Sequence, residues 1–161
     1  MADTKDELAG VVDLFGGLAR DELEQALVEL AFKQAEEVER EAVAAEIERA
    51  VEDYYLVDAE YAAEGGSEAT ETLLVAGPAA FPTVPENGED LPHILDVPDR
   101  ELDREELGET VADRLFEEAR TVAAAGDAER AQELLDVSYD LEAWAPVEAD
   151  DVRERLDRAF E

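Results

Sequence analysis

The residue best suited to acid–base or metal chemistry is the only histidine, His93, in the stretch Asp90-Leu91-Pro92-His93-Ile94-Leu95-Asp96. As a catalytic base it would be held by Asp90 or Asp96 and would need a nucleophile beside it. The sequence has no cysteine and no G-x-S-x-G motif, and it lacks the second histidine of an H-E-x-x-H metal site. We therefore interpret His93 as a structural or surface residue, with contact to a partner as its other role.

Paired carboxylates could serve as general acids and bases or as cation ligands. The pairs are Glu36-Glu37, Glu105-Glu106, Glu117-Glu118 and Asp150-Asp151. Because 46 of the 161 residues are acidic, such pairs arise by chance and nothing sets one apart as a site. The glycine pairs at 16–17 and 65–66 lack the surroundings of a nucleotide-binding loop. We predict that the protein is not an enzyme and holds no metal or cofactor.

The charge balance is strongly acidic, with 13 lysines and arginines against the 46 acids and a formal net charge of −33. The acids are spread evenly, since residues 1–76 hold 21 acids and 5 bases and the remainder holds 25 and 8. Hydrophobic residues make up 46% of the chain. A disordered acidic chain would combine high charge with low hydrophobicity, so this chain is expected to fold.

The choice of residue types points to the solvent as the reason for the charge. Lys5 and Lys33 are the only lysines and Ile47 and Ile94 the only isoleucines, whereas arginine, alanine and valine are plentiful. This composition is typical of halophilic archaea, and a mimic of nucleic acid is the alternative. No apolar run approaches the roughly 18 residues that span a membrane, and residues 1–7 do not resemble a signal peptide. We predict a cytoplasmic location.

Apolar side chains three and four residues apart predict three helices before residue 54. The three stripes are Leu8, Val11, Val12 and Phe15; Leu23, Ala26, Leu27, Leu30 and Ala31; and Val43, Ile47, Ala50, Val51 and Tyr54. Alternating residues then predict strands over 54–61 and 70–76, joined by a turn at 64–68. This order of elements over residues 4–76 resembles a winged helix, a variant of the helix-turn-helix.

The resemblance implies DNA binding through the third helix, which would enter the major groove. However, Arg40 and Arg49 are the only bases in the stretch 39–53, and the expected hairpin tip has none. The acids of that stretch are Glu39, Glu41, Glu46, Glu48, Glu52 and Asp53. A DNA-binding face needs a local concentration of bases. We therefore predict docking to another protein, and keep a transcription regulator that uses Arg40 and Arg49 as the alternative.

Residues 77–98 hold five of the six prolines together with the apolar residues Phe81, Val84, Leu91, Ile94, Leu95 and Val97. Because so many apolar groups are costly to expose, we predict an ordered strap over 77–102 that packs against the lobes on both sides. The remaining chain, 103–161, is predicted to be helical. Asp103 and Asp127 are expected to cap two helices that Gly126 separates, and Pro146 ends the second.

Two points of the C-terminal lobe stay open. The second helix either runs to Trp144 or breaks near Val137, and Trp144 either fills the core or contacts a partner. The last helix is expected to bury Val152, Leu156 and Phe160, which lie four residues apart.

The segments 73–82, 90–98 and 134–146 resemble a family of uncharacterised haloarchaeal proteins, which implies a host but no activity. The sequence predicts an α+β, mainly helical fold: a winged-helix-like lobe over 1–76, the strap over 77–102 and a helical lobe over 103–161. The expected role is a non-enzymatic interaction or regulatory module whose partner is another protein. The oligomeric state stays open.

Overall fold

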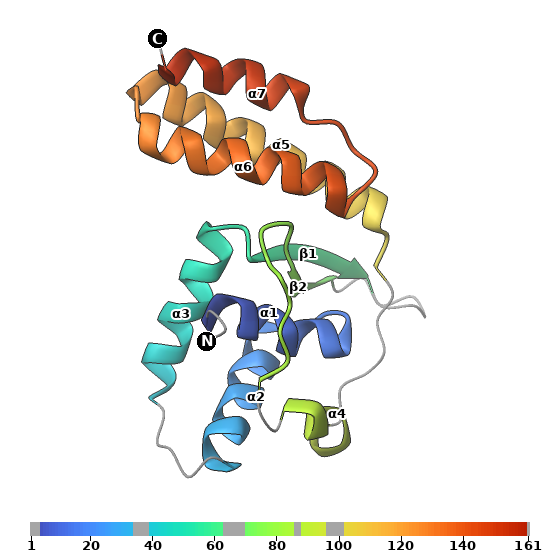
Figure 1. The fold of residues 1–161 in the computed structure, drawn as a ribbon. Coiled ribbons are helices and arrows are strands. Elements are labelled where there is room, and N and C mark those ends of the chain that lie inside the picture. The colour runs from blue at the N-terminus through green and yellow to red at the C-terminus, as the bar shows by residue number, and fades with distance from the viewer. Residues whose placement is uncertain (1–3, 34–38, 63–69, 86–87, 96–101, 161) are drawn as a thin grey trace. The chain divides into compact units, whose positions relative to one another are not determined.

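The computed structural model describes residues 4–33, 39–62, 70–85, 88–95 and 102–160. The chain divides into two compact units, Met1–Leu102 and Asp103–Glu161. The described residues form α-helices, two short 3-10 helices and one antiparallel two-stranded sheet (Figure 1). The prediction of a mainly helical α+β fold is confirmed.

The first unit begins with three helices, α1 (Thr4–Phe15), α2 (Arg20–Lys33) and α3 (Arg40–Glu52). Each helix follows one of the apolar stripes of the sequence. Gly16, with φ 82°, adopts the left-handed conformation that follows the end of α1. The side chain of Glu22 accepts a hydrogen bond from the backbone N–H of Ala19 at 2.8 Å and so fixes the start of α2.

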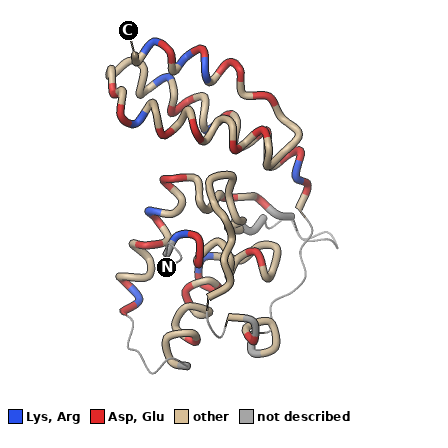
Figure 2. The backbone as a smooth tube through the Cα atoms, viewed as in Figure 1, with Lys and Arg blue, Asp and Glu red and all other residues tan. Residues whose placement is uncertain are grey.

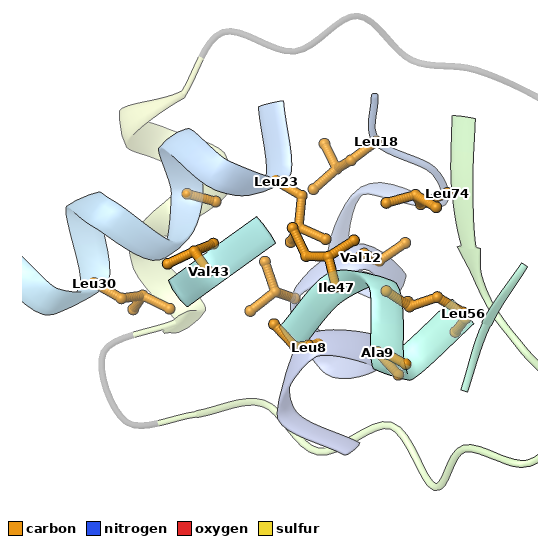
Figure 3. Close-up of a cluster of buried hydrophobic side chains, with 14 of the residues drawn as sticks. Leu8, Ala9, Val12, Leu18, Leu23, Leu30, Val43, Ile47, Leu56 and Leu74 are labelled. Carbon is orange, nitrogen blue, oxygen red and sulfur yellow. The ribbon is translucent and has the colours of Figure 1, made fainter. Parts of the chain in front are cut away.

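The core of the first unit is an apolar cluster to which all three helices and both strands contribute (Figure 3). Its fully buried or nearly fully buried members include Leu8, Val12, Leu18, Leu23, Ile47, Leu56 and Leu74. Burying one such leucine or isoleucine stabilises the fold by about 2 kcal/mol. The cluster therefore fixes which face of α3 points inward and which face stays in solvent.

Strands β1 (Leu56–Ala62) and β2 (Thr70–Ala76) pair antiparallel, with Leu56 opposite Ala76. Between α1 and α2, Leu18 forms an isolated bridge with Leu74: its N–H donates to the Leu74 carbonyl at 3.0 Å and its carbonyl accepts from the Leu74 N–H at 2.6 Å. The sequence placed Tyr54 in the first strand, which is wrong. Tyr54 is buried with φ 66°, and this left-handed residue delays the strand to Leu56.

The strap after β2 is attached to α1 by its backbone. The N–H groups of Phe81 and Thr83 donate to the Asp6 carboxylate and the Asp6 carbonyl, both at 3.0 Å. Further along lie a 3-10 turn (Gly88–Asp90) and the short helix α4 (Leu91–Ile94), in which Leu91 is fully buried.

The expectation that the strap buries its apolar side chains is confirmed for Leu91 but wrong for Phe81 and Val84, which are 80% and 40% exposed. The physical reason is that backbone hydrogen bonds, and not these two side chains, hold residues 81–83 on α1. Val97 and the turn predicted at 64–68 lie outside the described residues.

The second unit contains three packed helices, α5 (Arg104–Ala125), α6 (Ala128–Trp144) and α7 (Asp150–Asp157), followed by a 3-10 turn (Arg158–Phe160). The predicted caps are confirmed. Asp103 accepts from the N–H groups of Glu105 and Glu106, and Asp127 accepts from the N–H of Arg130. Gly126 takes the left-handed conformation with φ 66° at the corner.

Two details of this unit go beyond its periodicity. Helix α6 runs without a break to Trp144, which resolves the end that the sequence left open. The expectation that Phe160 is buried is wrong, because Phe160 is 45% exposed while Ala159 is buried. The last turn is a 3-10 turn with three residues per turn, so the residue beneath Leu156 is the one three positions on.

Candidate interaction surface

The third helix is held so that one face is buried and the other lies in solvent. Val43, Ile47 and Ala50 are buried in the core of the first unit. The exposed residues of α3 are Arg40, Glu41, Ala42, Ala45, Glu48, Arg49 and Glu52. Figure 2 shows acids and bases interspersed along this helix. The solvent face therefore combines two arginines, three glutamates and two small apolar residues.

Two arginines on or beside this face, Arg49 and Arg20, form ion pairs. Arg49 Nη1 lies 2.7 Å from Glu46 Oε1 on the preceding turn. Arg20, at the start of α2, donates to the carboxylate of Glu48 and lies 3.8 Å from Asp58 Oδ1 on β1. A guanidinium already paired with carboxylates must lose those contacts before it can bind a phosphate.

Arg40 differs from these two arginines. It lies at the first position of α3, is exposed, and forms no ion pair with any residue that the structure describes. Its neighbours in sequence are Glu39 and Glu41, which are also exposed. Of the two arginines that the sequence singled out for nucleic acid, the structure thus keeps Arg40 accessible and pairs Arg49 with a glutamate.

The residues proposed as partner contacts lie in different units. His93 is exposed within α4 of the first unit, and no group of metal-binding side chains occurs among the described residues. Trp144 ends α6 in the second unit, where it is half-buried and the guanidinium carbon of Arg104 lies 4.3 Å from its ring centroid. Stacking of this kind is a cation–π contact that orders both side chains.

A polar cluster that sequence reasoning missed joins α6 to α7. Arg153 donates to both carboxylate oxygens of Glu142 at 3.1 and 3.0 Å, and to Asp150 at 2.6 Å. Its guanidinium carbon lies 4.4 Å from the ring centroid of Tyr139, a residue that is 57% exposed. Only the spacing of Asp150 and Arg153, three residues apart on a helix, could have indicated part of this cluster.

The cluster shifts two pKa values in opposite directions. The hydrogen bonds from Arg153 and from the N–H of Ala149 lower the pKa of the Glu142 carboxyl. The same carboxylate raises the pKa of Arg153 above its ordinary value. Nearby, partial burial and then the charge of Asp136 raise the pKa of Asp140. The paired Glu142 and Arg153 therefore join the end of α6 to α7.

Some large apolar side chains are exposed on the surface and do not pack into the core. Phe32 and Phe81 of the first unit are each 80% exposed. None of the described helices is both long and apolar enough to cross a membrane. Exposed aromatic residues of this size are common anchors in protein interfaces.

Comparison with known proteins places the chain in a family without assigning it an activity. Neither the curated proteins nor the solved structures include one that matches this sequence significantly. A sequence model described as a family of unknown function, DUF7109, matches residues 6–161 and therefore covers both units. The chain belongs to this family of unknown function, DUF7109.

Proposed function

We propose that the protein is a non-enzymatic interaction module whose first unit is a winged helix that binds another protein. The order α1, α2, α3, β1, β2 supports the winged-helix assignment. So does the bridge from Leu18 to Leu74, because winged helices place a short strand between their first two helices against the second strand of the hairpin. In this architecture α3 is the helix that a DNA-binding member would present.

The observation that carries the proposal is the charge of the exposed face of α3. Glu41, Glu48 and Glu52 are exposed there, and Arg49 is paired with a glutamate. Phosphates would be repelled by these carboxylates, and each phosphate contact requires an available base. The exposed alanines at 42 and 45 leave a small apolar area between the charged residues of the same face.

The cellular setting is part of the same proposal. The net charge of −33, with Lys5 and Lys33 as the only lysines, supports a halophilic archaeal cytoplasm as the place of action. At molar salt the Debye length is about 3 Å, so that the carboxylates no longer repel one another over the distance between helices. A partner is therefore expected to be bound at high salt by apolar and hydrogen-bonded contacts.

The test against DNA binding uses arginine reversal. Binding of labelled mixed-sequence duplex DNA would be followed by fluorescence anisotropy over a series of KCl concentrations. We expect no DNA binding of the kind that weakens steeply with salt, as phosphate contacts do. The anisotropy should be the same for the wild type and for Arg40→Glu plus Arg49→Glu. The matched control, Arg120→Glu plus Arg158→Glu in the second unit, makes the same change in charge elsewhere on exposed positions.

The second candidate function, a DNA-binding regulator, is favoured by one observation: Arg40 is exposed and forms no ion pair with any residue that the structure describes. Salt-dependent DNA binding that the Arg40→Glu plus Arg49→Glu variant loses and the control retains would establish it in place of the proposal.

The positive test is capture of a partner by tagged protein from native lysate at molar KCl. Ala42→Arg plus Ala45→Arg should abolish capture, since these substitutions crowd the exposed face of α3 without touching the core. Ala124→Arg plus Ala128→Arg, at exposed positions of the second unit, is the control and should capture as the wild type does. Capture by none of the proteins, or equal capture by both variants, would refute docking through α3.

A further inference from the structure

The outer edge of β1 can be located from the hydrogen bonds of the hairpin. Both backbone polar groups of Leu74 bond to Leu18, so they point away from β1. Leu74 lies opposite Asp58 in the register, and the two therefore form a pair without mutual backbone bonds. It follows that the N–H and C=O of Asp58 point away from β2, and by the two-residue repeat so do those of Glu60.

Within the part of the chain that the structure describes, no other segment pairs with this edge. Among the residues that the structure describes, no backbone group outside the hairpin bonds to the N–H or C=O of Asp58 or Glu60. Both side chains are exposed, at the point where β1 extends beyond the core residue Leu56. The opposite edge of the sheet, by contrast, is occupied at Leu74 by Leu18. An open edge is a template for one further strand.

The charges along the edge select the kind of strand. Asp58 shares Arg20 with Glu48, at the longer distance of 3.8 Å, and Glu60 has no ion pair among the described residues. A second copy of β1 would place carboxylates opposite carboxylates, and like charges directly opposite each other destabilise a pair of strands. A strand with lysine or arginine at alternate positions would instead complement the edge.

We propose that the outer edge of β1, at Asp58 and Glu60, binds an extended basic segment of a partner protein as an added strand. This inference rests on the proposed role as a protein-binding module. It adds a second binding surface, the edge of β1, to the one proposed on α3. Main-chain hydrogen bonds supply the attachment, and the two carboxylates supply the preference for basic residues. The same carboxylates disfavour pairing of the edge with another copy of this chain.

The direct probe is a synthetic peptide of alternating lysine and valine, added to the labelled full-length protein. Backbone amide hydrogen exchange, followed by NMR, should slow by about tenfold or more at Asp58 and Glu60. A control peptide in which prolines replace some of the valines keeps the same number of lysines, and so the same charge, but cannot extend a ladder. The proposal would be overturned if both peptides slowed amide exchange equally, or if the peptide slowed exchange only at residues other than 58 and 60.

The decisive variant is Asp58→Pro. Proline is tolerated where an edge N–H faces solvent, so it removes the outward donor and leaves the β1–β2 ladder intact. We expect it to weaken peptide binding at least about tenfold, whereas Asp58→Ser, which also lacks the charge but keeps the N–H, should lose less. Unchanged exchange protection of Val57 and Ala59 would show that the hairpin of the Asp58→Pro variant is folded, and equal binding by both variants would refute strand addition.

Failure of this inference can be told apart from failure of the proposed function. Suppose that the wild type captures the native partner, that Ala42→Arg plus Ala45→Arg does not, and that Asp58→Pro still does. The proposed function is then supported and the binding of a strand at the β1 edge is refuted. If the peptide pairs with Asp58 and Glu60 while no partner is captured from lysate, strand addition at β1 is supported and docking through α3 is refuted.

Discussion

At the scale of single residues, two helical glycines let a neighbouring segment approach the backbone of a helix. A Cβ atom on Gly10 of α1 would lie 2.0 Å from the carbonyl oxygen of Thr83 in the strap. In α5, a Cβ atom on Gly108 would lie 2.6 Å from the Cβ of Ala145. Glycine normally weakens a helix interior, so at both positions close packing outweighs helix propensity.

Gly10→Ala should therefore destabilise the first unit, although alanine is the better helix former by about 1 kcal/mol. The methyl group must displace the backbone at Thr83, and overpacking of this kind typically costs about 1–3 kcal/mol. Chemical denaturation would measure the change in free energy of unfolding. Asp13→Ala, at an exposed position of the same helix, is the control and should stay within about 0.5 kcal/mol of the wild type. A gain in stability for Gly10→Ala would show that the strap does not rest on α1.

At the scale of elements, one side chain organises the joint between α6 and α7. Glu142 accepts the N–H of Ala149, just before the first residue of α7, at 2.9 Å and pairs with Arg153 one turn into that helix. A carboxylate at a helix N-terminus offsets the unsatisfied N–H groups and the positive end of the helix dipole. Glu142 thus satisfies, from α6, the backbone N–H of the residue that precedes α7.

Because the folded-state pKa of Glu142 is lowered, its contribution to stability is present above its unfolded pKa of about 4.3 and is lost as the pH falls through the folded value. Glu142→Gln should cost on the order of 1 kcal/mol at neutral pH. The difference from wild type should shrink below about pH 4.3. Urea denaturation at a series of pH values checks this, with Glu154→Gln, an exposed acid of α7, as the control. A pH-independent difference would mean that packing, and not charge, underlies the effect.

At the scale of the whole molecule, the charge spans both units instead of marking a site. Acids occur on every described α-helix except α4 (Figure 2), and the excess over bases is similar in residues 1–76 and 77–161. Ion pairs absorb part of it, as at Arg130, which bonds to Glu118 across the α5–α6 corner. The rest repels itself, and net charge this far from zero opposes the compact state.

The melting temperature should therefore rise with KCl, as the Debye length falls from about 30 Å at 0.01 M to about 3 Å at 1 M. A gain of about 2 kcal/mol would correspond to roughly 4–8 °C for a chain of this size. Circular dichroism during heating measures it. Replacing the exposed acids Glu41, Glu109, Asp113 and Glu154 by their amides should reduce the rise. An identical rise in that variant would indicate a specific ion effect in place of screening.

The local features of this fold could be predicted from the sequence because their causes lie within a few residues. Apolar spacing located the helices, and the residues Asp103, Gly126 and Asp127 marked the ends of two of them. Such capping hydrogen bonds join atoms two to four residues apart, so the signal and the structure are in the same stretch. The alternation that predicted the hairpin is local in the same way, although it could not locate the left-handed Tyr54.

For the candidate surface, the sequence determined the residue types of α3, and only the tertiary structure decided which of them are exposed and which form ion pairs. The pairing of Arg20 with Glu48 joins residues 28 positions apart, and the bridge from Leu18 to Leu74 joins the segment between α1 and α2 to strand β2. The exposure of Phe81 likewise depends on the backbone bonds from the strap to Asp6. Contacts between residues far apart in the sequence depend on how whole elements pack together. The periodicity within one element does not indicate which other elements it will contact.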